Sequence, residues 1–313
     1  GKMHIGHAFS YIQGDIIARF RKITGYNLFY PFGTDDNGLP TERLVEKTKK
    51  IKSLDMTREE FIELAEKTIK ELKPEFVQDW KDIGVCANFK QSYSTIDEHC
   101  IKTSQHSFID LFNKGLIEQK ESPVSWCPHC RTAIAQAEFE NIEKKSFFME
   151  IAFKQGEKEL IISTTRPELL PSCVALFANP QDKRYKDLIG KNAEVPLFNY
   201  EIPILSDENV DMELGTGLMM CCTFGDKEDI EKWAKYDLPL RISFTKDGKM
   251  NELAEKYKGL KIDEARKKIA EDLQEKGLLK NQKEIIHNTN VHDKCGTPIE
   301  FMKTKQWFIK ILD

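Results

Sequence analysis

The chain has 313 residues, of which 47 are basic and 51 acidic, so its formal net charge is -4. This length predicts two domains, each with its own core. The balanced charge gives no sign of a broadly basic nucleic-acid surface, so such a partner must use local patches. The absence of both a secretory signal and a run of about 18 apolar residues excludes export and a membrane span, and favours the cytoplasm.

Eight cysteines in a chain of this length do not resemble a dense disulfide framework. Their spacing indicates metal binding in a reducing compartment instead. The chain starts at Gly1 and ends at Asp313 on a periodic apolar run. We therefore interpret it as a segment of a larger protein.

A His-x-Gly-His motif, His4 to His7, precedes the first amphipathic run. The run predicts a helix that stops near Gly25, and the motif lies in the turn before it, where backbone N-H groups favour phosphate. Imidazole donors there can stabilise charge on a triphosphate, while Gly6 lets a nucleotide approach the backbone. A simple helix cap is the alternative. The helical spacing is carried by Phe9, Ile12, Ile16, Phe20 and Ile23.

After this helix, residues 26–30 predict a buried strand that ends at Pro31. The Gly- and Pro-rich loop 31–40 follows and carries Asp35 at the C-terminal end of a presumed parallel strand, where ligands of open α/β sheets bind.

Two further helices are expected. Thr57 and Glu60 form a capping box for one that ends before Pro74, and apolar residues 101–112 mark another, closed by Gly115. Residues 1–120 therefore resemble half of a doubly wound α/β (Rossmann) fold.

The middle of the chain has a different character. Residues 147–153, 159–164 and 195–205 predict strands, whereas the helices expected there cover only 226–236 and 263–276. This block is interpreted as a separate, β-rich α+β domain.

Four potential metal ligands flank this block. Cys127 and Cys130 have the two-residue spacing that places two thiolates on one tetrahedral ion, and His292 and Cys295 repeat it. Together they predict a closed, structural Cys3His zinc site, which would force the intervening block out as an insertion. In the alternative interpretation the first pair is a buried hairpin and His292 an exposed loop residue, with His129 or His287 as rival ligands.

Inside the block, Thr164, Thr165 and Arg166 follow a predicted strand, and Asp226 and Asp229 begin a predicted helix. An Asp can hold an ammonium group, Thr hydroxyls can position water or ribose, and Arg can hold phosphate, so the set suits an amino acid ester. An equally good interpretation is purely structural. The two threonines could be plain strand residues, and the two aspartates could complement the dipole of the helix that they begin.

Five segments of the chain are similar to the valyl-tRNA synthetase family of the archaeal type, within the class I aminoacyl-tRNA synthetases. They are residues 1–46, 125–140, 164–178, 207–239 and 291–313.

The resemblance implies an interrupted Rossmann catalytic domain with an inserted editing domain. The implied layout is a first half of the catalytic domain at 1–120, a zinc-bearing connector (zinc knob) at 121–143 and 286–303, an editing domain at 144–285 and a return segment at 304–313.

For the catalytic domain, the resemblance implies that His4, Gly6 and His7 bind ATP and that Asp35 binds the amino group of the amino acid. Bacterial members have His-Ala after that aspartate. Asp36-Asn37 stands there in this chain, which favours the archaeal branch.

For the insertion, Thr164, Thr165 and Arg166 match the threonine-rich editing segment, and Asp226 and Asp229 match its paired aspartates, with Asp229 as the expected amino-group anchor. Met220 and Cys222 stand where bacterial members have Lys and Thr.

The zinc quartet of the family often has four cysteines, so His292 is a further departure. A Lys-Met-Ser-Lys-Ser loop and the anticodon-binding domain would lie beyond Asp313.

The implied activity is valine-tRNA ligation through valyl-adenylate, with hydrolytic editing of threonyl-tRNA. The implied cofactors and partners are ATP with Mg2+, structural Zn2+, valine and tRNA, with no membrane and a monomeric state. We expect this segment alone to retain only the editing activity. A leucyl or isoleucyl enzyme, a free-standing deacylase and a tRNA-binding module are the alternatives.

Overall fold

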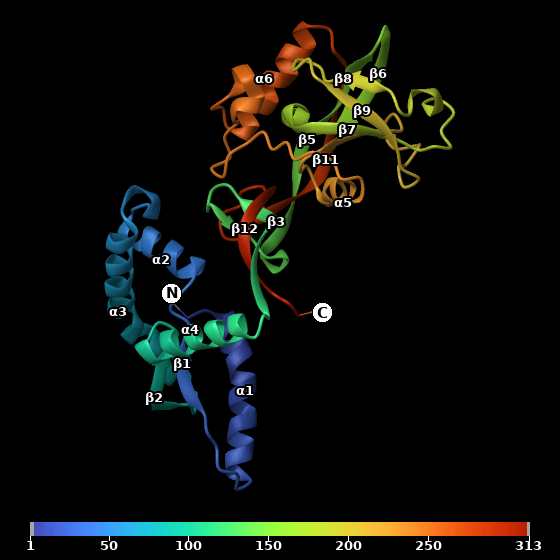
Figure 1. Ribbon diagram of the computed structural model, residues 1–313. Helices are drawn as coiled ribbons and strands as arrows, with labels where there is room; N and C mark the ends of the chain where they lie inside the picture. The colour runs from blue at the N-terminus through green and yellow to red at the C-terminus, as the bar shows by residue number, and fades with distance from the viewer. Residues whose placement is uncertain (1–2, 312–313) are drawn as a thin grey trace. The chain divides into compact units, whose positions relative to one another are not determined.

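The computed structural model describes residues 3–311. The chain forms two compact units, Gly1–Glu118 with Phe308–Asp313, and Gln119–Trp307 (Figure 1). The sequence placed the corresponding divisions at 120 and 304. None of the helices within residues 3–311 combines the length and the apolar character that a membrane span needs.

The first unit contains two parallel strands, with Phe32 beside Ser92 and Gly33 beside Tyr93. Parallel strands require a crossover, and helices supply it here, as predicted for half of a doubly wound fold. The elements are α1 (Ile5–Ile23), β1 (Pro31–Thr34), α2 (Leu39–Lys49), η1 (Ser53–Asp55), α3 (Arg58–Asp82), β2 (Asn88–Ser94) and α4 (Glu98–Asn113).

The predicted strand at 26–30 is wrong. The strand begins where the prediction ended it, at Pro31, and Phe29 is 79% exposed. Pro31 lacks an N-H but can start a strand, and the residues after it find their partner in β2, more than fifty residues away. Asp35 nevertheless follows the carboxyl end of β1, as expected.

The helix predicted to stop before Pro74 continues to Asp82. Proline removes one intrahelical hydrogen bond. The extra turns, however, bring Phe76 and Trp80 against Phe32, and this burial outweighs the local loss. The start of the same helix is as predicted, because Thr57 and Glu60 form a reciprocal capping box.

The second unit consists mainly of antiparallel strands. One sheet has the order β10-β7-β9-β8-β5-β11, with β6 also on β5, and a smaller sheet has the order β12-β3-β4. The strands are β3 (Ile117–Cys127), β4 (Thr132–Ala133), β5 (Phe139–Gln155), β6 (Lys158–Thr164), β7 (Cys173–Ala178), β8 (Asn192–Glu194), β9 (Glu201–Ser206), β10 (Leu218–Cys222), β11 (Leu279–His292) and β12 (Glu300–Ile309).

Helical segments complete this unit. They are η2 (Gln136–Glu138), η3 (Pro167–Ser172), η4 (Lys186–Leu188), α5 (Lys227–Lys235), η5 (Glu252–Tyr257) and α6 (Ile262–Glu275). Both predicted helices are therefore present. The strand predicted at 195–205 begins only at Glu201, because Leu197 and Asn199 adopt positive φ values of 70° and 51° in a turn.

The longest pairing of the second unit joins β5 and β11, from Ile151 opposite Leu279 to Phe139 opposite His292 (Figure 1). This pairing carries the chain from the core of the unit to the turns that hold the cysteines. Trp126 and Met302, which come from the two flanking segments, belong to the same hydrophobic core as Ile151 and Ile162.

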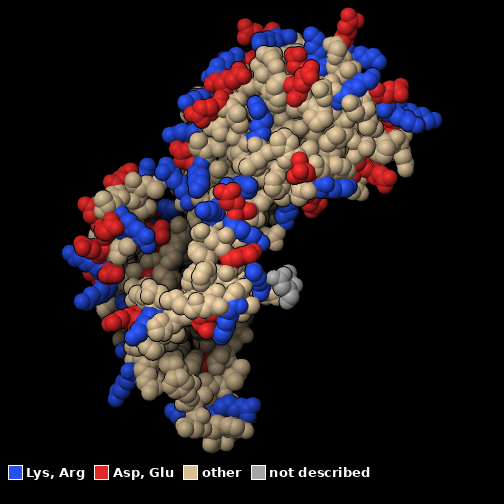
Figure 2. Space-filling model, in the orientation of Figure 1, with Lys and Arg blue, Asp and Glu red and all other residues tan. Residues whose placement is uncertain are grey.

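The surface carries mixed charge. On the face shown in Figure 2, Lys and Arg are interspersed with Asp and Glu. The apolar positions that predicted α1 are largely exposed, including Phe9, Ile16, Phe20 and Ile23.

Candidate functional site

The His-x-Gly-His motif forms a reciprocal cap at the start of α1. The backbone N-H of His7 donates to Nδ1 of His4 at 3.3 Å, and the backbone N-H of His4 donates to Nδ1 of His7 at 3.4 Å. The two rings stack with centroids 3.7 Å apart. A Cβ at Gly6 would lie 3.1 Å from the His4 ring, so glycine leaves room for this stack.

This cap determines which nitrogen of each neutral imidazole carries the proton. Because each Nδ1 accepts a hydrogen bond, a neutral ring carries its proton on Nε2. Burial and the neighbouring His4 ring both lower the pKa of His7, which favours that neutral form. The motif therefore caps α1, and the cap leaves two Nε2-H donors available beside a helix N-terminus, where anions are favoured.

A cavity of about 560 Å³ in the first unit brings His7 and Asp35 together. Trp80 and Tyr93 are among the aromatic residues that line it. Its size and its mixture of aromatic and charged groups suit a small organic ligand. His4 and Gly6 are not among its lining residues.

A hydrogen-bond chain orients Asp35. The backbone N-H of Asp36 donates to Oγ1 of Thr95 at 2.9 Å, and that hydroxyl donates to Oδ1 of Asp35 at 3.1 Å. The Asp36 carboxylate is held separately, by Lys73 at 2.9 Å and by two hydroxyls, those of Thr34 and Ser94. Both aspartates thus line the cavity, but the Asp36 carboxylate is engaged by protein partners and anchors the loop.

The pKa of Asp36 is consistent with that division. Burial alone would raise it, but the hydrogen bonds from Ser94, Thr34 and Lys73 hold it below its ordinary value. Asp36 therefore remains a charged structural anchor.

A second cavity, of about 500 Å³, lies in the second unit. Residues from the β6–η3 loop, from β10 and from the start of α5 line it. It brings together all five residues predicted for the insertion: Thr164, Thr165, Arg166, Asp226 and Asp229.

Asp229 is the most unusual acid of this cavity, with only 5% of its surface exposed. Its carboxylate accepts hydrogen bonds from the backbone N-H groups of Gly225, at 2.9 Å, and Cys222, at 3.3 Å. Burial, with the neighbouring charge of Asp226, nevertheless raises its pKa to about 7. A bound cation would relieve this penalty, because opposite charge favours the ionised form.

Asp226 has a structural role as well. Its Oδ1 accepts the backbone N-H of Asp229 at 2.9 Å and caps α5. The helix-terminus interpretation thus applies to Asp226, whereas the Asp229 carboxylate is turned back toward Gly225.

Arg166 donates to three protein acceptors: Oε1 of Glu168 at 2.9 Å, Oε2 of Glu300 at 2.6 Å and the carbonyl of Gly225 at 3.0 Å. With its guanidinium engaged in this way, Arg166 is placed to position the cavity wall, and its geometry does not favour phosphate binding.

The two threonines differ. Oγ1 of Thr164 accepts the backbone N-H of Arg166 at 3.0 Å and shapes the loop. Thr165 also lines the cavity. Met220 and Cys222 line the same cavity, so its wall is apolar where the bacterial pattern would place Lys and Thr.

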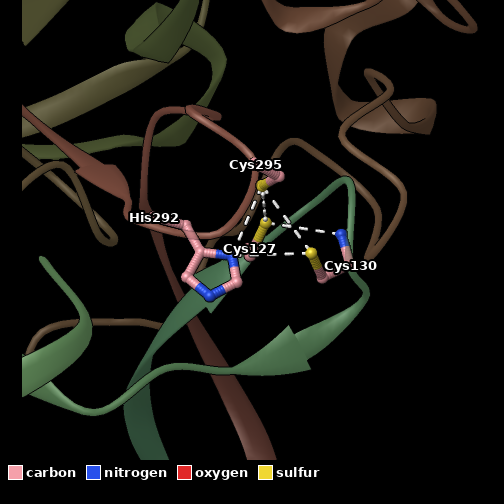
Figure 3. Close-up of side chains that lie close together, drawn as sticks. All are labelled: Cys127, Cys130, His292 and Cys295. Carbon is pink, nitrogen blue, oxygen red and sulfur yellow. Dashed lines mark hydrogen bonds between the residues drawn. The ribbon is translucent and has the colours of Figure 1, made fainter. Parts of the chain in front are cut away.

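Cys127, Cys130, His292 and Cys295 converge at the ends of β3 and β11 and in the turns that follow them (Figure 3). Sγ of Cys295 lies 3.5 Å from Sγ of Cys127, 3.7 Å from Sγ of Cys130 and 3.3 Å from Nδ1 of His292. Two sulfurs at about 2.3 Å from a tetrahedral zinc are about 3.8 Å apart, so the quartet fits such an ion.

His292 is fully buried, so its interpretation as an exposed loop residue is wrong. Its Nε2 lies 3.7 Å from Oδ1 of Asp293. The rival ligand His287 instead contacts Oγ1 of Thr289, at 3.2 Å.

Three of the four potential ligands are thiols that lie close together. Burial and the adjacent Cys127 raise the pKa of Cys130 to about 12. Clustered thiolates ionise together only when a positive ion compensates their charge.

Several residues of these sites were not predicted. Glu300 contacts Arg166 across 134 positions of sequence, and no local pattern marks it. Thr95 and Lys73 reach the Asp35–Asp36 loop from β2–α4 and α3, equally without a motif. Of these residues, Gly225 alone could have been noticed in the sequence, because it is a glycine directly before a predicted helix start.

Comparison with known proteins shows the family of this chain. A family model described as tRNA synthetases class I (I, L, M and V) matches residues 1–313, and the chain belongs to this family. Within the family it is similar to valine-tRNA ligases. It is 49% identical over 313 residues to the valine-tRNA ligase of Thermoplasma acidophilum, covering 100% of this chain and 40% of that protein.

The valine-tRNA ligase of Ehrlichia canis is 46% identical over 322 residues, again covering 100% of this chain and 40% of the relative. The chain thus spans about 40% of the length of these relatives. Among solved structures, a LeuRS of Agrobacterium radiobacter K84 in a ternary complex with tRNA and LeuAMS matches 92% of this chain and 43% of that one, at 17% identity and a TM-score of 0.38.

Proposed function

We propose that this chain belongs to a valine-tRNA ligase that also hydrolyses threonyl-tRNA. In the first reaction the valine carboxylate attacks the α-phosphorus of ATP, which gives valyl-adenylate and releases pyrophosphate. The terminal ribose hydroxyl of tRNA then attacks the carbonyl carbon and AMP leaves. The similarity to valine-tRNA ligases over the whole chain is the observation that carries this proposal.

His4, Gly6 and His7 are proposed to bind ATP. The reciprocal cap supports this role, because it directs both imidazole Nε2-H groups away from the backbone and leaves them able to donate to phosphate oxygens. Mg2+ would accompany the nucleotide. Asp35, oriented by Thr95 in the first cavity, is proposed to hold the ammonium group of valine.

Editing is proposed for the second cavity. Valine and threonine are nearly isosteric, and an apolar pocket rejects an added hydroxyl by only about a hundredfold. A second, hydrolytic site removes the resulting error: water attacks the ester carbonyl of threonyl-tRNA and releases threonine and free tRNA.

Within that cavity, Asp229 is proposed to anchor the ammonium group of the threonyl ester. Its burial and raised pKa support this role, since a carboxylate in such a place gains from a bound cation. Thr165, the backbone and the ribose hydroxyl are proposed to position the water. Thr164, Arg166 and Asp226 shape the cavity around them.

A structural zinc ion is proposed for Cys127, Cys130, His292 and Cys295. Four protein ligands would close the coordination sphere and leave no position for substrate, so the ion would stabilise the turns without reacting. Such a site suits a cytoplasmic protein with reduced thiols.

Amino-acid-dependent exchange of pyrophosphate into ATP by the protein that carries this chain tests the valyl assignment. We expect exchange with valine and much less with leucine or isoleucine. Exchange that prefers leucine or isoleucine would favour one of those enzymes, and binding of tRNA with neither exchange nor hydrolysis would favour a binding module.

A further inference from the structure

Gly225 links the Asp229 carboxylate to the wall of the second cavity. Its backbone N-H donates to Oδ2 of Asp229 at 2.9 Å, and its carbonyl accepts from Nη1 of Arg166 at 3.0 Å. A side chain at position 225 would overlap Oδ2 of Asp229. Gly225, together with the backbone N-H of Cys222, therefore fixes where the carboxylate lies.

Arg166 is itself held by two buried acids. Oε2 of Glu300 accepts from Nη2 at 2.6 Å, and Oε1 of Glu168 accepts from Nε at 2.9 Å. Glu300 is 4% exposed and Glu168 is 1% exposed. Hydrogen bonds between ionised groups at such distances are the strong ones, and their geometry is well defined.

A second arginine, Arg266, also contacts Glu168. Arg266 makes two further hydrogen bonds to Glu168, at 2.9 and 2.8 Å, and its Nη1 lies 3.5 Å from Oδ1 of the more exposed Asp263. Two guanidinium groups thus face two buried carboxylates. Glu168 is shared between both arginines, whereas Glu300 contacts Arg166, so without Glu300 the Nη2 of Arg166 would lose its acceptor and Arg166 would share one buried carboxylate with Arg266.

We propose that Glu300 is a positioning residue for the hydrolytic cavity, acting through Arg166 and Gly225 on Asp229. This inference rests on the proposed editing function. It also gives a role to β12, the strand that follows the metal-binding turn, because Glu300 is its first residue. The turn is closed by hydrogen bonds from His292 to Thr297 and from Ile299 to Asn290, directly before Glu300.

Two substitutions of Glu300 distinguish the effect of its charge from the effect of its size. Glu300→Gln keeps the size of the side chain and removes its charge, whereas Glu300→Asp keeps the charge and removes one methylene group. Hydrolysis of threonyl-tRNA specific for valine is measured with the protein that carries this chain. Zinc content, the unfolding midpoint and valine-dependent pyrophosphate exchange serve as controls for the fold.

We expect Glu300→Gln to lower the hydrolysis rate about tenfold, and Glu300→Asp to stay within about threefold of wild type, because loss of a charge-assisted hydrogen bond is the larger effect. Pyrophosphate exchange should not change. Hydrolysis by Glu300→Gln within twofold of wild type, or a reversed order of the two variants, would overturn the proposal.

Arg166→Lys gives a second test should Glu300→Gln not fold. Lysine keeps the positive charge but cannot reach Glu168, Glu300 and the Gly225 carbonyl together. We expect a similar loss of hydrolysis, and an unchanged rate would contradict the inference. If wild type and Asp229→Ala hydrolyse the ester equally, the editing proposal itself fails, which is distinct from a failure confined to Glu300.

Discussion

Oδ2 of Asp229 accepts a 2.9 Å hydrogen bond from the backbone N-H of Gly225, and a methyl group on Gly225 would overlap that same oxygen. Asp226 thus caps the helix, and Asp229, three residues later, turns its carboxylate back onto the loop that precedes the helix. This arrangement buries a carboxylate next to a cavity large enough for an amino acid ester.

Gly225→Ala is expected to displace Asp229 and to lower hydrolysis of threonyl-tRNA at least about tenfold, because small misplacements of a binding group are costly. The rate of ester hydrolysis measures this. Gly14→Ala is the matched control, since the space around the Cβ position of Gly14 is open. Equal rates for wild type and Gly225→Ala would show that the position of Asp229 does not matter.

Asp229 should make stability depend on pH. Its pKa of about 7 in the folded state exceeds the ordinary value of 3.8, so the folded state binds the proton more tightly. The free energy of unfolding should therefore fall as pH rises from about 4 to about 8, by on the order of 4 kcal/mol.

Urea unfolding of wild type and Asp229→Asn across this pH range isolates the contribution of Asp229 to the free energy of unfolding. The stability difference between the two proteins should change with pH, in the direction that favours the variant at high pH. A difference that stays constant would mean that the Asp229 carboxyl has an ordinary pKa.

Removal of the metal should destabilise the second unit. We expect about one zinc ion per chain, bound by four protein ligands. Cys130→Ser should reduce the zinc content and lower the unfolding midpoint, whereas Cys100→Ser, outside the quartet, should change neither. Metal analysis together with thermal unfolding checks this. Full zinc content in Cys130→Ser would exclude that residue as a ligand.

Thr95 should affect valine binding more than ATP binding. Thr95→Val removes the hydroxyl that donates to Asp35, whereas Thr95→Ser retains it. We expect the KM for valine in pyrophosphate exchange to rise about fivefold in the valine variant and to stay near wild type in the serine variant. A parallel rise in the KM for ATP would indicate a general disturbance of the first unit.

The features that could be predicted from the sequence are those set by neighbouring residues. The Thr57–Glu60 capping box and the paired spacings of Cys127 with Cys130 and of His292 with Cys295 act over three positions, so the pattern itself determines the geometry.

Contacts over long sequence separation could not be predicted in this way. The start of β1 depends on its pairing with β2, and the continuation of α3 past Pro74 depends on the packing of Trp80 against Phe32. The contact of Glu300 with Arg166 is of the same kind, since only the folded second unit brings the two residues together.

Hydrolysis of threonyl-tRNA specific for valine, by wild type and by Asp229→Ala, is the decisive test of whether the second cavity is an editing site. Both proteins should first be shown to bind zinc and to have equal unfolding midpoints. We expect release of threonine by wild type and at least about a hundredfold less by the variant, because a buried ammonium anchor would be lost. Equal release by both proteins, or none by wild type, would contradict it.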